Sequence, residues 1–256
     1  IPAVVGLGSC STEVSGGDLV ILDGTKGIII INPDEATLKD YRARLKRFRH
    51  FSKGLSRLRD LPAETLDGLR VKVYANIEFP AEVESAVAFG ADGIGLYRTE
   101  FLYLEMDRIP TEQEHFEAYR HSVDRLKGRP LVIRTLDLGG DKVLPELGLG
   151  RERNPALGYR SIRFCLDHLE AFRPQLRAIL RASAFGAVKI LLPMISSVEE
   201  IQQFKGILAE TREELDRESV PYDREIKVGI MIEVPSAAMS SDLLAREADF
   251  FSIGTN

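Results

Sequence analysis

The sequence predicts an α/β protein built on a (β/α)8 TIM-type barrel that is truncated, with about six βα units present. Short apolar runs rich in β-branched residues alternate with helical stretches from residue 63 onward, which indicates a parallel sheet flanked by helices. Six such steps in about 190 residues match the spacing of a barrel. No glycine fingerprint follows the first run, so a nicotinamide-binding sheet is not expected. A doubly wound sheet remains the alternative on periodicity alone.

The composition is that of a soluble globular protein. Apolar residues make up 44% of 256 residues, enough for one large domain or two smaller ones. A net charge of −5 argues against a nucleic-acid binder. No apolar run approaches the roughly 20 residues of a membrane helix and no signal segment opens the chain, so we expect a cytoplasmic location and no membrane partner. Cys10 and Cys165 lack metal-site or disulfide spacing and are expected to be free structural thiols.

The first residues predict a pair of strands. Residues 18–24 and 27–33 are β-branched runs punctuated by Gly, Asp and Pro, and a Gly-Thr-Lys-Gly turn at 24–27 joins them. This length is too short for an independent domain. We therefore expect residues 1–33 to be the end of a domain.

Residues 34–62 predict a helical linker. Asp34 follows a proline and is suited to cap the helix, and apolar side chains recur at three- and four-residue steps from Leu38 to Leu58. Eight Lys or Arg and no acid lie between Arg42 and Arg59. This run is either a polyanion-binding arm or the solvated face of the helix. We favour the solvated face because the apolar stripe is continuous. Such a helix would span roughly 35 to 40 Å.

The barrel is expected over residues 63–256, incomplete at its C-terminus. Its predicted strands share a short, β-branched pattern: residues 71–77, 93–97, 131–136, 188–194, 228–234 and 250–253. Helical stretches with apolar residues at three- and four-residue steps are expected between them: residues 81–89, 111–126, 169–185 and 198–216.

Arginines gather where the predicted strands end, on the side of a barrel that carries reactive groups. Arg98 ends the second strand, Arg134 lies in the third, and Arg160 lies in a loop that runs into a helix. An arginine near the end of a buried strand needs a carboxylate or an anionic ligand. Three together favour a small anion with two or three charges. The alternative is that each pairs with a nearby acid: Glu100, Asp137 or Asp141.

Glu233 ends the fifth predicted strand and is a candidate ligand for Mg2+, a hard cation that takes few protein oxygens and shares the rest with phosphate and water. By itself it is equally suited to pair with an arginine. The four histidines lie in helical stretches and are expected at the surface: His50, His115, His121 and His168. No catalytic triad or phosphate-binding P-loop can be assembled.

Six strings in order resemble enzyme I of the phosphoenolpyruvate-dependent phosphotransferase system, the phosphoenolpyruvate-protein phosphotransferase family. Each string is a moderate signal, and together they cover the whole chain. They are GIGLYRTEFL from residue 93, IRTLDLGGDK from 133, NPALGYR from 154, LRASAFG from 180, GIMIEVP from 229 and DFFSIGTN from 249.

The resemblance implies a swivelling phosphohistidine domain, a helical linker and a phosphoenolpyruvate-binding barrel. Arg98, Arg134, Arg160 and Asn256 would bind the phosphate and carboxylate of phosphoenolpyruvate, and Glu233 would be one Mg2+ ligand. The phosphoryl group would pass to an enzyme histidine and then to the histidine-containing phosphocarrier protein. The resemblance also implies a homodimer. It does not separate the sugar-transport version of the family from the nitrogen-regulatory one.

The resemblance also implies missing parts. The family's phosphorylated His, in a Thr-Ser-His motif, would precede residue 1, and its second metal-ligand Asp and its late Cys would follow Asn256. We therefore expect no catalytic residue within this chain and no turnover by it alone. Two alternatives stay open. One is an ATP-consuming pyruvate phosphate dikinase or phosphoenolpyruvate synthase, and the other is a non-catalytic phosphoenolpyruvate sensor.

Overall fold

The computed structural model describes residues 2–55, 57–106, 108–139, 154 and 156–255. The chain divides into two compact units, Ile1–Leu61 and Pro62–Asn256.

The first unit begins with a short helix and a two-stranded antiparallel sheet. Helix α1 spans Cys10–Glu13, and strands β1 (Val20–Asp23) and β2 (Ile28–Ile31) pair antiparallel, with Asp23 opposite Ile28. The Asp23 carboxylate accepts hydrogen bonds from the backbone N–H groups of Thr25 and Lys26, each at 3.1 Å, which fixes the turn. The predicted strand pair is confirmed.

Helix α2, Glu35–Leu55, follows the hairpin as predicted. The Asp34 carboxylate accepts from the N–H of Thr37 at 2.7 Å, so Asp34 caps the helix. None of the helix residues is buried, and the side chains of Phe48 and Phe51 are 62% and 64% exposed. The basic residues therefore lie on a solvated helix, and the apolar stripe of this helix is exposed to solvent as well.

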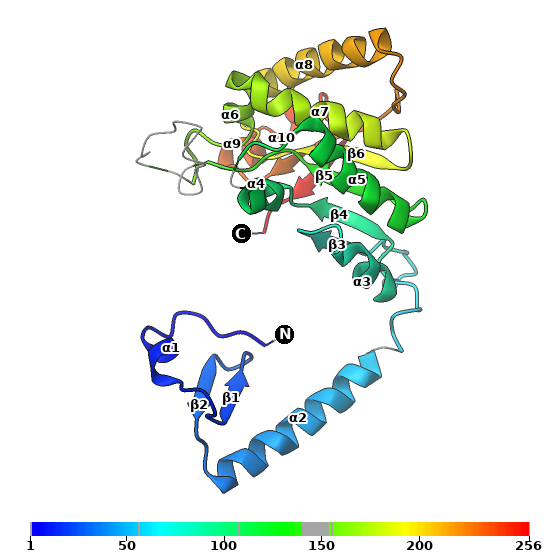
Figure 1. Cartoon of the computed structure of the whole chain (residues 1–256). Helices are drawn as coiled ribbons and strands as arrows, with labels where there is room; N and C mark the ends of the chain where they lie inside the picture. Colours follow the sequence, from blue (N-terminus) through cyan, green and yellow to red (C-terminus); the bar gives the residue numbers. More distant parts are fainter. Residues whose placement is uncertain (1, 56, 107, 140–153, 155, 256) are drawn as a thin grey trace. The chain divides into compact units, whose positions relative to one another are not determined.

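The second unit contains a curled, parallel, six-stranded sheet (Figure 1). Its strands lie in space in the order in which they occur along the chain: β3 (Tyr74–Ile77), β4 (Gly93–Tyr97), β5 (Leu131–Arg134), β6 (Val188–Leu192), β7 (Lys227–Ile232) and β8 (Phe250–Ile253). This half-barrel confirms the truncated barrel. A doubly wound sheet is wrong, because its strand order reverses part-way across the sheet.

The helices α5, α7 and α8 cover the outer face of the curled sheet (Figure 1). The apolar sides of helices and strands meet in one buried core that includes Tyr97, Tyr119, Phe172 and Phe204. The helices in the described part of this unit lie between successive strands: α3 (Glu82–Ala88), α4 (Glu100–Met106), α5 (Glu112–Leu126), α6 (Ile162–Asp167), α7 (Leu169–Ser183), α8 (Val198–Arg217), α9 (Pro235–Met239) and α10 (Ser241–Leu244).

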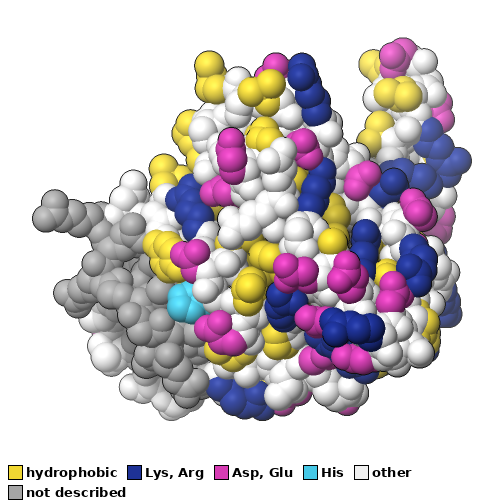
Figure 2. Space-filling model, turned by 90° about the horizontal axis from the view of Figure 1, so that it is seen from above, with side chains coloured by type: hydrophobic (Ala, Val, Ile, Leu, Met, Phe, Trp, Pro, Cys, Tyr) yellow, Lys and Arg dark blue, Asp and Glu magenta, His cyan; other side chains and the backbone are white. Residues whose placement is uncertain are grey.

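Ion pairs connect α5, α7 and α8 on the solvent side. Arg177 on α7 donates to Glu112 of α5 at 2.6 Å and to Glu214 of α8 at 3.2 Å, and Arg181 reaches Glu112 at 2.6 Å. Basic and acidic side chains are accordingly interspersed on the face seen in Figure 2, rather than separated by sign. This arrangement does not resemble a basic surface for nucleic acid.

The register of the last two strands brings a glycine against an aromatic ring. Gly229 of β7 is the direct partner of Phe250 in β8. A side-chain carbon at position 229 would overlap the Phe250 ring. The ring therefore occupies the space that the missing side chain leaves.

The surface prediction for the histidines is wrong for His115. It is fully buried on α5, where its Nδ1 lies 3.0 Å from the hydroxyl of Tyr119. His115 shares the inward face of α5 with Tyr119, four residues further along the helix. Cys165 is a free, buried thiol, as expected. None of the helices in the described residues is both long and apolar enough to cross a membrane.

Candidate functional site

The carboxyl ends of β4 and β5 bring two predicted site arginines to neighbouring positions. Tyr97 pairs with Ile133 across these parallel strands. Arg98 directly follows Tyr97 at the end of β4, and Arg134 directly follows Ile133 at the end of β5. Parallel strands present their carboxyl ends on the same side of the sheet, where barrels hold their reactive groups. The two guanidinium groups therefore belong to one site.

Arg134 is the centre of a buried ion cluster. Its side chain is only 11% exposed, and its terminal nitrogens lie 2.6 Å from Glu100 and 3.0 Å from Asp137. The other oxygen of Asp137 accepts from Arg160 at 2.8 Å. Asp137 thus connects the arginine of β5 with the arginine of the loop before α6.

Arg98 pairs with Glu78, which directly follows β3, at 2.8 Å. All three arginines are therefore paired with acids, which is the alternative raised from the sequence. Glu78 was missed there because its strand end carries no arginine. Asp141, the other acid considered, lies outside the described residues, and so does the predicted substrate ligand Asn256.

Burial and ion pairing both act on the pKa values of Glu100 and Arg134. Desolvation raises the pKa of the Glu100 carboxyl, and the ion pair with Arg134 opposes that shift. Burial alone would lower the pKa of Arg134, but the carboxylates of Glu100 and Asp137 outweigh it and raise the pKa. Arg134 is therefore a permanent positive charge in a poorly solvated position.

Glu233 follows β7, at the same end of the sheet. Its Oε1 accepts from the backbone N–H of Met194 at 2.8 Å, and Met194 has a left-handed φ of 59°. Desolvation and the charge of Asp137 raise the pKa of Glu233, whereas the Met194 N–H, Arg134 and Arg160 lower it. These charges place Glu233 within electrostatic reach of the arginine cluster.

Arg160 is held in place by its backbone as well as by Asp137. Residue Gly139 forms an isolated antiparallel bridge with Arg160, with a φ of 144°. A side chain at position 139 would collide with the backbone and Cβ of Arg160. Only glycine permits this close approach, so the loop carrying Arg160 lies against the extension of β5.

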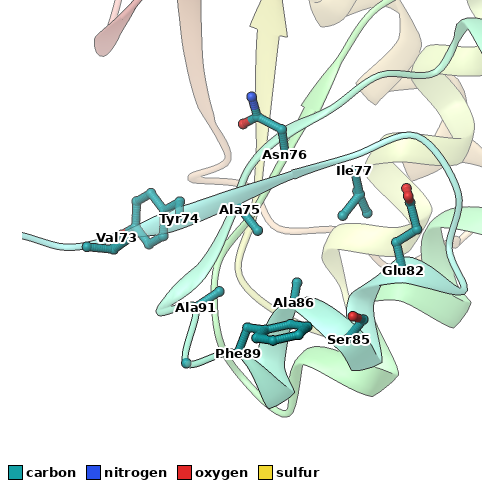
Figure 3. Close-up of a pocket in the computed structure, with 11 residues that line it drawn as sticks. Val73, Tyr74, Ala75, Asn76, Ile77, Glu82, Ser85, Ala86, Phe89 and Ala91 are labelled. Carbon is teal, nitrogen blue, oxygen red and sulfur yellow. The ribbon is translucent and has the colours of Figure 1, made fainter. Parts of the chain in front are cut away.

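A hollow of about 410 Å³ lies elsewhere, between β3 and α3. Figure 3 shows Ala75 and Ile77 on the strand side and Ala86 and Phe89 on the helix side. This hollow contains Glu82 but no arginine. Binding a small anion requires positive charge, so the candidate site is the arginine cluster and not this hollow.

A family model described as the PEP-binding domain of PEP-utilising enzymes matches residues 52–256. The chain belongs to this family. It is 48% identical over its whole length to the phosphoenolpyruvate-protein phosphotransferase of Staphylococcus carnosus, and it covers 45% of that relative. The proteins of the same name from Staphylococcus aureus strain MSSA476 and from Bacillus sp. strain S are 47% and 48% identical over all 256 residues. The chain thus spans less than half the length of these curated relatives.

The family match includes the described charges of the candidate site. Arg98, Arg134, Arg160 and Glu233 all fall within residues 52–256, whereas the hairpin and most of α2 fall outside them. Within the described residues, no group of three or more His, Cys, Asp or Glu side chains is arranged to hold a metal ion. A metal at Glu233 would therefore need oxygens from other sources.

Proposed function

We propose that the protein carrying this chain is a phosphoenolpyruvate-protein phosphotransferase. It transfers the phosphoryl group of phosphoenolpyruvate to an enzyme histidine and then to the histidine-containing phosphocarrier protein. In this proposal Arg98, Arg134, Arg160 and Asn256 bind the substrate, and the chain contains no phosphoacceptor. The observation that carries the proposal is the convergence of three arginines, from two adjacent strands and one loop, at one end of the sheet.

The electrostatics of the cluster support an anionic substrate that binds with a cation. Among the described residues, three arginines and four carboxylates belong to this set, the carboxylates being Glu78, Glu100, Asp137 and Glu233. Without a cation, the net charge of this set is negative and does not favour the binding of an anion. A divalent ion beside Glu233 would reverse the sign of the net charge and would attract phosphoenolpyruvate.

The residues present fit a magnesium ion that takes few protein ligands. Glu233 supplies one half-buried carboxylate, and Mg2+ commonly binds through one or two carboxylates plus phosphate oxygens and water. When bound, the ion would neutralise charge that develops on the phosphoryl group. The arginines would hold the phosphate and carboxylate in line, because phosphoryl transfer depends mainly on positioning and positive charge.

The proposal assigns a role to each part of the chain. Residues 1–33 end a swivelling phosphohistidine domain, residues 34–62 are the helical linker, and residues 63–256 are the phosphoenolpyruvate-binding barrel. The complete protein acts as a homodimer, and the 256 residues alone do not turn over. Steady-state transfer to the carrier protein by the isolated chain would contradict this last statement.

Labelling the complete protein with phosphoenolpyruvate that carries a radioactive phosphoryl group tests the function. With Mg2+ and without nucleotide, we expect an acid-labile phosphoprotein, as a phosphohistidine gives. Label that appears only with ATP would indicate a dikinase or synthase instead. Binding of phosphoenolpyruvate with no label under either condition would indicate a sensor.

A further inference from the structure

A buried side-chain amide lies directly behind the charged site. Gln175 is on α7, and its side chain is fully buried. A buried amide is costly unless its hydrogen-bonding atoms are satisfied, because water is not available to them. Both ends of this amide find partners among the described residues.

The amide joins the ends of two site strands. Its oxygen accepts from the backbone N–H of Leu136 at 2.9 Å, just beyond β5. Its nitrogen donates to the hydroxyl of Thr99, just beyond β4, at 3.0 Å. The Thr99 hydroxyl in turn donates to the backbone carbonyl of Arg134 at 3.0 Å. One side chain therefore connects β4 and β5 through three consecutive hydrogen bonds.

Each residue joined to Gln175 or Thr99 by these three bonds is a site arginine or lies next to a charged site residue. Thr99 is between Arg98 and Glu100, and Leu136 precedes Asp137. The third bond ends on the carbonyl of Arg134 itself. Displacement of this network would therefore move both carboxylates that hold Arg134, together with Arg98.

The nitrogen of Gln175 also lies 3.2 Å from the hydroxyl of Tyr119 on α5. The network is thus anchored in the outer helices as well as in the sheet. Thr99, Tyr119 and Gln175 are all fully buried. A polar network that is enclosed and satisfied in this way fixes the geometry of its members more strictly than apolar packing does.

We infer that Gln175 is a positioning residue that aligns the phosphoenolpyruvate-binding arginines through Thr99 and Leu136. This inference rests on the proposed function, since it concerns the same site. Gln175 does not touch the substrate in this scheme. It sets the separation and orientation of Arg98 and Arg134, so its loss acts mainly on substrate binding.

The test compares Gln175→Met with wild type in the complete protein. Methionine has a similar length and no amide, so it leaves the Thr99 hydroxyl and the Leu136 N–H without their partner. We expect the KM for phosphoenolpyruvate to rise about 10- to 100-fold, since small misplacements of binding groups have effects of this size. We expect kcat to change by less than about threefold.

Ser183→Ala is the matched control. Ser183 is on the same helix, is 5% exposed, and accepts from the N–H of Asp223 at 2.8 Å. Its loss also removes a buried hydrogen bond, but none of its bonds reaches a residue next to the site. We expect its thermal midpoint to fall while its KM stays at the wild-type value. A KM for Gln175→Met equal to that of wild type overturns the inference, as does an equal rise in KM for both variants.

Gln175→Glu is a second variant, which keeps the inference testable if the methionine variant does not fold. Its pH dependence is a readout that general destabilisation would not produce. A protonated carboxyl can donate to Thr99 and accept from Leu136, whereas the ionised form cannot donate. We expect the ratio of the KM of this variant to the KM of wild type to fall about threefold or more when the pH is lowered from about 8.5 to about 6. A pH-independent ratio overturns the inference. Absence of phosphoenolpyruvate-dependent labelling in wild type would instead refute the proposed function.

Discussion

Asp137 is the residue on which the geometry of the candidate site depends most. It is 9% exposed and contacts Arg134 at 3.0 Å and Arg160 at 2.8 Å, so one carboxylate holds two guanidinium groups in a fixed relation. The sequence predicts Arg98, Arg134 and Glu233 as candidates from their places at or near strand ends, and Arg160 from its place in a loop before a helix. It names Glu100 and Asp137 among the possible acid partners but not Glu78, because Glu78 and Arg98 meet only after two strands have aligned.

Glu233→Gln tests the metal assignment. The amide keeps the shape of the side chain and an acceptor for the Met194 N–H, but it loses the charge that would attract Mg2+. We expect the Mg2+ concentration for half-maximal phosphoryl transfer to rise about 10- to 100-fold in the complete protein. Glu225→Gln, an exposed residue just before β7, should leave that concentration unchanged. An unchanged Mg2+ titration for Glu233→Gln would remove this residue from the metal site.

His115 should make the stability of the chain depend on pH. Burial lowers its pKa from 6.5 to about 4, so between these values the unfolded chain binds a proton that the folded chain does not. Stability from this residue is therefore present above about pH 6.5 and is lost as the pH falls toward about 4, at up to about 1.4 kcal/mol per pH unit.

Urea denaturation between pH 7 and pH 4 measures this dependence. His115→Asn should be less stable than wild type at pH 7, because ring packing is lost, but its stability should fall less steeply with acid. His121→Asn alters an exposed histidine of the same helix and should follow the wild-type curve. If the stability of wild type and of His115→Asn fell with equal slopes as the pH is lowered, His115 would not contribute to the pH dependence.

At the scale of elements, the periodicity of the sequence predicts the long helices and the strands well. The predicted strand at residues 188–194 ends at Leu192, because Met194 adopts a left-handed conformation and donates to Glu233. The short helices α4, α6, α9 and α10 were not predicted. They have four to seven residues, too few for an apolar repeat to become visible.

Helix α5 begins with a capping box. The Thr111 hydroxyl accepts from the N–H of Glu114 at 3.3 Å, and the Glu114 carboxylate accepts from the N–H of Thr111 at 2.8 Å. Thr111→Ala should lower the free energy of unfolding by about 1 kcal/mol in urea denaturation. Thr111→Ser keeps the hydroxyl and should restore most of that loss. Equal stability of the alanine variant and wild type would mean that the cap is satisfied by water instead.

At the scale of the whole molecule, the sheet has two edges. Among the described residues, β3 pairs only with β4, and β8 pairs only with β7. The sequence predicts this half-barrel from the count of βα units. It cannot predict how two exposed strand edges behave in solution, because that depends on encounters between molecules and not on local pattern.

We expect the isolated chain to self-associate through these edges. The Ile253 side chain on β8 is 76% exposed, and a charge there opposes pairing between edges. Ile253→Lys should therefore reduce the concentration-dependent increase in mass that sedimentation velocity measures for the wild-type chain. Leu66→Lys adds the same charge at a fully exposed position outside the strands and should leave the increase in mass unchanged. An equal decrease in both variants would indicate a general effect of charge.

The contact between Gly229 and Phe250 has a consequence for evolution. The two residues are direct partners, and the aromatic ring fills the volume that glycine leaves open. A mutation that enlarges residue 229 would therefore be deleterious unless residue 250 had already become smaller. Homologous proteins should accordingly substitute these two positions in a correlated manner, with the reduction at 250 preceding the enlargement at 229 along each lineage.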